Sequence, residues 1–489
     1  MDHLNDLNTI SGILSASVFF IIGVIVIQLT RHRDSIADQT KIFILSFAVR
    51  MVMVIVTYYM GLLKILGDED SGGWVNGYLI YDKWLQEGQT FFSLPIAIWD
   101  YVEAQRDLGA YHYGYFLVVA VQFYVSNLPG RISAAALNVL FGSMVPVLAF
   151  RMCNQLFDNI KSARYVAWSL AFMPSLVVFS AQTLKEPVVV FLEVLCLYCC
   201  LQIAQFKIRF RHLIVLFVGI AVMSTLRFYV SYVIVGTFVL TLIIPPIFKS
   251  KYKKVFIGMV MLLSPLVFIV TYRSAIIELD QVRVEQSRKL QNYSKGFGDD
   301  TNFQLNSNVR NPFDITVKSE ILPGLLFGFL HLMYAPFPWQ LLQGSLRMSL
   351  TAPEMVWWYY NGSIRLFRGI RNALKTNFID SIIPIAFCLP LLLFYSLIFN
   401  NIGLAYRYRA QILPEFLIFI ALGYHNMKVI AMNQYSVEED DLSYDFEEEP
   451  EPIYSSGLGF KPGYYGLNQF GQNYHAQAQS PRYQDYYLD

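Results

Sequence analysis

Residues 42–74 read IFILSFAVRMVMVIVTYYMGLLKILGDEDSGGW, an apolar run that closes on three consecutive carboxylates. The run from 42 to 64 is long enough to cross a bilayer as a helix, because a span needs roughly 20 mostly apolar residues. Ionisable side chains delivered to the membrane by such a helix are costly and usually functional. This stretch therefore predicts a membrane helix followed by a functional loop that begins at Asp68, Glu69 and Asp70, the acidic triplet.

The whole chain has the composition of a membrane protein. Of its 489 residues, 55% are hydrophobic and 15% are charged, and the mean hydropathy is +0.42. Soluble domains carry about 25% charged residues. We therefore expect an all-α polytopic membrane protein with about 10 to 13 transmembrane or re-entrant helices, and with interfacial helices in the first external loop. The strongest apolar runs lie near residues 10–29, 42–64, 132–150, 165–181, 187–206, 229–247, 255–272 and 379–398, and weaker ones lie near 112–127, 213–226, 321–340, 354–369 and 410–425.

Short groups of basic residues between the apolar runs predict the orientation. The positive-inside rule places these groups in the cytoplasm, so loops 65–110 and 273–320 are expected outside. Between 110 and 151, and again between 321 and 369, two apolar segments lie where this orientation allows only one crossing of the membrane. We therefore expect one segment of each pair to be re-entrant, short or interfacial. The groups are Arg31, Arg33 and Lys41; Arg151, Lys161 and Arg164; Lys207, Arg209 and Arg211; Lys249, Lys251, Lys253 and Lys254; and Arg365, Arg368, Arg371 and Lys375.

The end of the chain differs from the rest. Residues 438–489 hold eleven acidic and two basic side chains, which leaves a net charge of +10 on residues 1–437. This acidic, tyrosine-rich segment has almost no aliphatic residues and cannot bury enough apolar surface to fold. We expect a transmembrane domain over 1–437 and a disordered cytoplasmic tail over 438–489. The tail is either a solvated extension or a docking segment for a protein partner.

The expected topology also collects charged residues from distant loops on the outer face. Besides the acidic triplet, it places Lys185, Arg227, Arg407 and Arg409 there. Arginine suits phosphate because its planar fork donates paired hydrogen bonds. Acidic and basic groups on one membrane face are the arrangement needed to bind an anionic lipid head group beside a general base.

Each of these groups also has a simpler interpretation. Juxtamembrane arginine and lysine side chains commonly reach head groups without specific binding. Lys185 and Glu186 can cap a helix as an ion pair. The acidic triplet can be a solvated loop start or an N-cap. The joint placement of these groups on one face is what favours a functional site.

Short motifs along residues 40–425 resemble those of a known superfamily. They are Asp70-Ser71-Gly72-Gly73-Trp74; Tyr113-Gly114-Tyr115 leading to Pro129-Gly130-Arg131-Ile132-Ser133; Phe172-Met173-Pro174-Ser175 with residues 180–187; Arg227-Phe228-Tyr229; and Arg407-Tyr408-Arg409 before Pro414. Together they resemble the GT-C type integral-membrane glycosyltransferases, which use polyprenyl-phosphate-linked sugars and include protein O-mannosyltransferases and lipid A aminoarabinose transferases.

This resemblance implies an inverting transfer from a lipid-linked sugar donor to a hydroxyl of an acceptor glycan, lipid or protein, on the external face of the cell (inner) membrane. Asp70 would be the catalytic base because its spacing to Trp74 fits the family motif, with Asp68 as second choice. Asp68 and Glu69 would position the acceptor. The side chains that would bind the lipid phosphate are Lys185, Arg227, Arg407 and Arg409.

The resemblance leaves the cofactor open. No cofactor is certain, but some members of the superfamily need a divalent metal ion, for which Asp68 and Asp70 are candidate ligands. The chain also departs from the family. Three acids stand where the O-mannosyltransferase pattern has an aspartate–glutamate pair, and loop 273–320 is too short for the soluble external domain that many members carry.

Other classes of protein fit some of these features. A transporter or flippase for lipid-linked or anionic solutes would use the same charged residues, but the chain has no convincing internal repeat and its charges are expected at helix ends. A membrane polysaccharide polymerase is a nearer enzymatic alternative, and a non-enzymatic assembly platform is a third. We expect membrane lipid as a partner and no nucleic acid.

Overall fold

In the computed structural model, all regular secondary structure of the described residues is helical, which confirms the all-α prediction. The chain divides into two units, residues 1–432 and 433–489. The second unit, and with it the expected tail over 438–489, lies outside the described residues. The structure describes residues 2–30, 35–62, 73–107, 113–205, 207, 209–249, 319, 321–341, 346–398 and 405–424.

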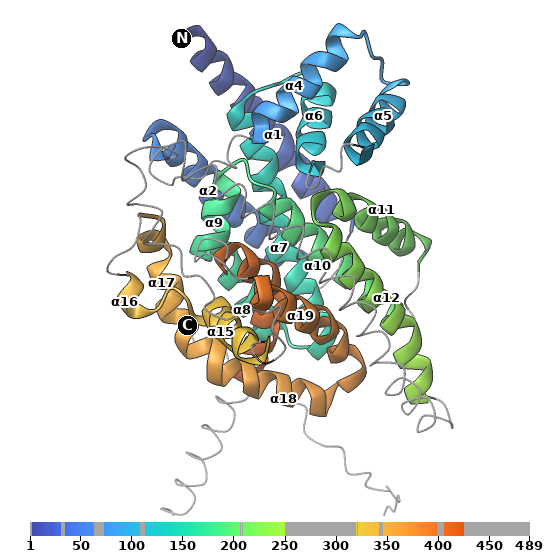
Figure 1. The fold of residues 1–489 in the computed structure, drawn as a ribbon, viewed down its shortest axis with the longest axis vertical. Coiled ribbons are helices and arrows are strands. Elements are labelled where there is room, and N and C mark those ends of the chain that lie inside the picture. Colours follow the sequence, from blue (N-terminus) through green and yellow to red (C-terminus); the bar gives the residue numbers. More distant parts are fainter. Residues whose placement is uncertain are drawn as a thin grey trace, which may run out of the picture. The chain divides into compact units, whose positions relative to one another are not determined.

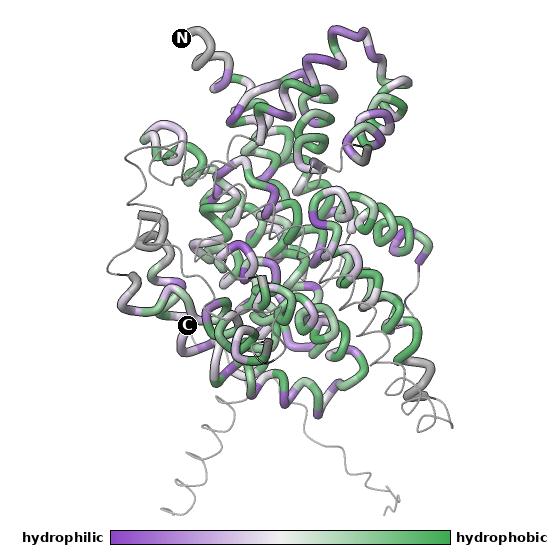
Figure 2. The backbone as a smooth tube through the Cα atoms, in the orientation of Figure 1, coloured by the Kyte–Doolittle hydropathy of each residue, from purple (hydrophilic) through white to green (hydrophobic). Residues whose placement is uncertain are grey.

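Among the described residues, five helices are long and apolar enough to cross a membrane. A sixth candidate span is broken into α8 (Ile160–Phe172) and α9 (Pro174–Ala181), which meet at 48°. Figure 2 shows hydrophobic residues along most of the length of these helices. The protein is therefore a multi-pass membrane protein. The five spans belong to α1 (Asp2–Leu29), α2 (Ile36–Tyr59), α7 (Arg131–Phe157), α10 (Glu186–Ala204) and α19 (Phe378–Ile398).

Shorter helices occur in the two regions, 110–151 and 321–369, where two apolar segments were expected to make only one crossing. The 13 residues of α6 (Gly114–Ser126) extend only ~20 Å, less than the ~30 Å hydrocarbon core. Between 321 and 369, three helices follow one another with breaks: α15 (Ile321–Tyr334), α16 (Pro338–Leu341) and α17 (Leu346–Tyr360). Helices α4 (Gly73–Gln86) and α5 (Leu94–Asp107) lie within the expected loop 65–110. The remaining helices are α11 (Phe210–Leu226), α12 (Phe228–Lys249), η3 (Asn361–Arg365), α18 (Leu366–Thr376) and the helix of residues 405–424.

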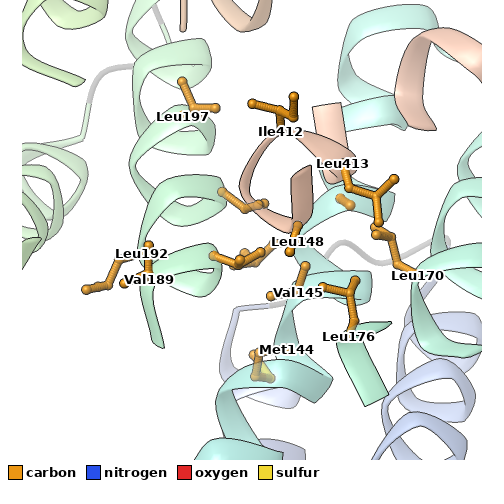
Figure 3. Close-up of a cluster of buried hydrophobic side chains, with 14 of the residues drawn as sticks. Met144, Val145, Leu148, Leu170, Leu176, Val189, Leu192, Leu197, Ile412 and Leu413 are labelled. Carbon is orange, nitrogen blue, oxygen red and sulfur yellow. The ribbon is translucent and has the colours of Figure 1, made fainter. Parts of the chain in front are cut away.

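Helix α7 is the central element of the bundle and contacts α1, α2, α8, α9 and α10 (Figure 1). Small side chains such as Ala134 and Ala136 let its neighbours approach closely, as is typical of helix interfaces in membranes. In Figure 3, Leu148 of α7 lies in one buried cluster with Leu192 of α10 and Ile412. This core holds α7, α10 and residues 405–424 together, and these elements carry most of the site described below.

Hydrogen bonds between distant segments define one end of the bundle. One of them joins the start of α8 to the start of α2, and two join the start of α19 to the ends of α7 and α10. Described members of four of the five basic groups lie near these helix ends, so we call this the basic end. Glu186 begins α10 at the opposite end, ~27 Å away along the helix. The hydrogen bonds are Arg164 to Asp38 (2.9 Å), Asn377 to the Leu156 carbonyl (3.0 Å) and Gln205 to Asp380 (2.6 Å).

The two ends of the bundle should be accessible from opposite sides of the membrane. Lys83 in α4 and Lys375 in α18 are exposed, whereas all five native cysteines are buried. Cysteines introduced as Lys83→Cys and Lys375→Cys are therefore expected to react with a membrane-impermeant thiol reagent from opposite sides of sealed vesicles. Labelling of both from the same side would contradict the topology on which the site depends.

Candidate functional site

The acidic triplet lies outside the described residues, and α4 is the helix that follows it. Helix α4 begins at Gly73, three residues after Asp70. A Cβ at Gly73 would lie 3.1 Å from the Tyr115 ring and 3.3 Å from the Thr183 carbonyl oxygen. The start of α4 is therefore packed against the segment that leads into α10.

Glu186 is the first residue of α10 and is 1% exposed. Pro187 follows it within the first turn, where the missing N–H of proline costs nothing. A carboxylate at this position also faces the positive end of the helix dipole. These local rules explain why α10 begins at Glu186.

Two arginines from distant segments converge on this carboxylate. Arg227, which separates α11 from α12, places its Nη2 atom 3.0 Å from Oε1 of Glu186. Arg407 places its Nη1 atom 4.0 Å from the same oxygen. Lys185, the N-cap residue of α10, adds a third positive charge to the surroundings of Glu186. We call these four residues the Glu186 cluster.

Aromatic side chains surround Arg227 and fix its position. Its Nη1 atom donates to the Tyr229 hydroxyl at 2.5 Å, and its guanidinium lies 5.6 Å from the centre of the Tyr408 ring. Tyr408 in turn stacks on Tyr395 at 4.3 Å between ring centres. Because the arginine is 4% exposed, these contacts hold the cation in a low-dielectric setting where its interactions are strong.

Arg409 does not belong to the Glu186 cluster, although sequence analysis grouped it with Arg407. Its Nη1 atom donates to the carbonyl oxygens of Met333 (3.2 Å) and Ala335 (3.0 Å), and its guanidinium lies 4.7 Å from the Tyr406 ring. Residues two apart on a helix point about 200° apart, so the two arginines serve different neighbours. Arg409 binds the end of α15, where carbonyls lack helical partners.

A small cavity opens beside Glu186. It is lined by Arg50 of α2, Ser180 of α9, Glu186 and apolar residues. The Oε2 atom of Glu186 has no hydrogen-bond partner among the described residues. Two charged groups therefore line the same cavity: the carboxylate of Glu186, which can accept a further hydrogen bond, and the buried guanidinium of Arg50.

Arg50 explains how the broken span α8–α9 is accommodated. Pro174 has no N–H to donate to the Leu170 carbonyl, and the Ser175 N–H donates instead to Glu354 (2.8 Å). Arg50 supplies the missing donors, with bonds to Leu170 (3.1 Å) and Ala171 (2.8 Å). A cation thus ends α8 and a carboxylate begins α9, in agreement with both helix dipoles.

Two further carboxylates lie deep in the bundle. Glu193 follows Glu186 by two turns of α10, and Glu415 lies within residues 405–424; both are 0% exposed. None of their four carboxylate oxygens has a hydrogen-bond partner among the described residues. The expectation that the charges sit at helix ends was therefore wrong for Arg50, Glu193 and Glu415. One charge in a long apolar run barely changes its hydropathy, which is why the pattern concealed them.

The described residues contain no group of three or more histidine, cysteine, aspartate or glutamate side chains suited to hold a metal ion. The candidate metal ligands Asp68 and Asp70 lie outside that part of the chain. Comparisons with protein families, curated proteins and solved structures found no match. The resemblance to GT-C type glycosyltransferases therefore rests on the motifs alone.

Proposed function

We propose that the protein transfers a sugar from a polyprenyl-phosphate donor to an acceptor hydroxyl at the membrane face that carries the Glu186 cluster. The observation that carries this proposal is the convergence of Arg227 and Arg407, from segments 180 residues apart, on the carboxylate of Glu186. Two guanidinium groups at the start of a candidate membrane span suit a phosphate monoester or diester.

In the proposed reaction Asp70 removes the proton of the acceptor hydroxyl. The acceptor oxygen then bonds to the anomeric carbon of the sugar from the side opposite the lipid phosphate. The bond between that carbon and the phosphate oxygen breaks, and its electron pair leaves with the lipid phosphate. Arg227, Arg407 and Lys185 bind the phosphate and stabilise the negative charge that develops on it. Arg409 holds the end of α15 and acts only through the structure.

The length of the chain allows Asp70 to reach this site. Gly73 follows Asp70 by three residues, and three extended residues span at most about 11 Å. Gly73 itself packs against Thr183, which precedes Glu186 by three residues in the turn that leads into α10. A base attached to this short tether can therefore face a phosphate bound by the arginines, without any large rearrangement of α4.

Replacing Asp70 by asparagine tests the proposal, because asparagine keeps the size of the side chain but cannot accept the proton. Transfer from a labelled polyprenyl-phosphate sugar by the reconstituted protein should fall roughly 10² to 10⁴-fold, the usual contribution of a general base. Glu87→Gln, an exposed carboxylate at the end of α4, is the matched control and should keep the full rate. An Asp70→Asn protein that folds and transfers at the original rate would exclude this base. Loss in Asp68→Asn alone would move the role to Asp68.

A transporter remains the second candidate, because Glu193 and Glu415 are buried acids within the bundle. Intramembrane carboxylates without partners are typical of proton and ion pathways. The same reconstituted vesicles separate the two functions. Uptake of a lipid-linked or anionic solute without any glycosylated product would favour transport, whereas product formation without a solute gradient would favour transfer.

A further inference from the structure

Helix α18 lies at the basic end, far from the Glu186 cluster. Its sequence, LFRGIRNALKT, separates apolar and charged residues onto different faces more sharply than any other described helix. It contains three cations and no acidic residue. In Figure 1 it runs across one end of the bundle rather than along it, and in Figure 2 hydrophilic and hydrophobic residues alternate along it.

One face of α18 is fixed by its packing on residues 405–424. Leu366, Gly369 and Ala373 are buried and lie on this face. A side-chain carbon on Gly369 would collide with the Phe419 carbonyl, and one on Gly423 would collide with the Arg365 carbonyl. The two backbones therefore touch at a glycine crossing, which leaves little freedom for α18 to rotate and so determines which residues point outwards.

The outward surface has an apolar strip beside a cationic strip. Phe367 is 70% exposed, and Leu374 lies within about 20° of it around the helix. Arg371, Lys375 and Arg368 are exposed and fill the next sector, about 60° wide. Helices that lie in the plane of a membrane interface have this arrangement, with apolar side chains among the acyl chains and cations at the head groups.

We propose that α18 lies in the membrane interface and binds anionic lipid head groups through Arg368, Arg371 and Lys375, with Phe367 inserted beside them. A lipid leaflet fits this surface better than a protein, because the cations and the exposed aromatic ring follow one another in the order of head group and acyl chain. The cytoplasmic leaflet, which the positive-inside rule assigns to the basic end, carries the anionic lipids. This inference is independent of the proposed transfer reaction.

The test compares two variants that lose the same charge at the same end. The full chain is titrated in mixed micelles with phosphatidylglycerol or phosphatidylcholine, and binding is measured from the thermal unfolding midpoint. A cation held directly against an anionic lipid surface contributes roughly fivefold to such binding. Removing the three exposed cations of α18 should raise, at least tenfold, the phosphatidylglycerol concentration that gives half of the full shift in the unfolding midpoint. The variants are Arg368→Gln/Arg371→Gln/Lys375→Gln and, as the control outside α18, Lys207→Gln/Arg209→Gln/Arg211→Gln.

The control triple should shift this concentration less than threefold, since Lys207 and Arg209 precede α11 and only Arg211 lies within it, so the three cations do not form a strip along one helix face. Equal shifts in both triples would mean that only the overall charge matters and would overturn the proposal. So would an original protein that does not distinguish phosphatidylglycerol from phosphatidylcholine.

A second measurement reports the depth of α18 without removing its charges. A fluorescent dye is attached to Phe367→Cys or to Thr376→Cys, which is exposed on a different side of the same helix. In vesicles that contain phosphatidylglycerol, a lipid with a nitroxide on its acyl chain should quench the dye at position 367 at least threefold more than the dye at 376. Equal quenching at the two positions would overturn insertion of Phe367.

Discussion

Replacing Arg227 by glutamine is expected to lower the free energy of unfolding by about 3–5 kcal/mol, the usual cost of breaking a buried ion pair. The side chain of Glu186 is 1% exposed and that of Arg227 is 5% exposed, so water cannot replace the lost partner. Arg407 remains, but at 4.0 Å it cannot form the short hydrogen bond that Arg227 makes. Titration with SDS in mixed micelles, followed by circular dichroism, measures the change.

The double variant Arg227→Gln/Glu186→Gln separates structure from function. It removes both charges and leaves two amides that can bond to each other, so it should recover at least about 2 kcal/mol of the loss. Transfer activity should nevertheless be lost in the double variant, as in Arg227→Gln, because a neutral amide cannot stabilise the charge on a leaving phosphate. A double variant that is stable and active would remove Arg227 from the proposed phosphate site.

The exposed ion pair of Arg164 and Asp38 provides the matched control. Its N–O distance is 2.9 Å, close to that of the buried pair, but its side chains are 49% and 27% exposed. The cycle Arg164→Gln with Asp38→Asn should give a coupling energy of only about 0–1 kcal/mol. Similar coupling in the two pairs would show that burial does not strengthen the contact between Glu186 and Arg227.

The membrane spans were predictable from sequence because crossing a bilayer requires a long apolar run, and length and hydropathy are visible without any structure. The candidate site was predictable only in part. Arg227 stood out as a charge at the end of an apolar run, and Glu186 stood beside Lys185 at a helix start. Their ion pair depends on how α10 packs against the junction of α11 and α12, which no local pattern encodes.

Arg407 and Arg409 show where sequence reasoning reached its limit. Both precede the last apolar run, and both looked equally suited to a lipid phosphate. Helical geometry directs them to opposite neighbours, so only Arg407 approaches Glu186. Arg50 was concealed for a different reason: it lies in the middle of a run whose other residues are strongly apolar, and its partners are backbone carbonyls 120 residues away.

Replacing Arg50 by methionine should destabilise the protein by about 3 kcal/mol, because two carbonyls at the break between α8 and α9 would lose their donors inside the membrane. Methionine fills a similar volume, so the loss of packing is small. The carbonyls affected are those of Leu170 and Ala171. Arg50→Lys should cost less, since an ammonium group can still donate to one of them.

Whether Arg50 stabilises the protein by capping the broken helix can be tested by restoring the backbone N–H donor that Pro174 lacks. Pro174→Ala restores an N–H that can bond to the Leu170 carbonyl, as in an unbroken helix. In the Arg50→Met background this second change should recover at least about 1 kcal/mol, whereas in the original protein it should recover nothing. Pro390→Ala, which removes a proline from α19, is the control and should be additive with Arg50→Met within about 0.5 kcal/mol. If Pro174→Ala were also merely additive, Arg50 would stabilise the bundle through its charge or its packing rather than by capping the broken helix.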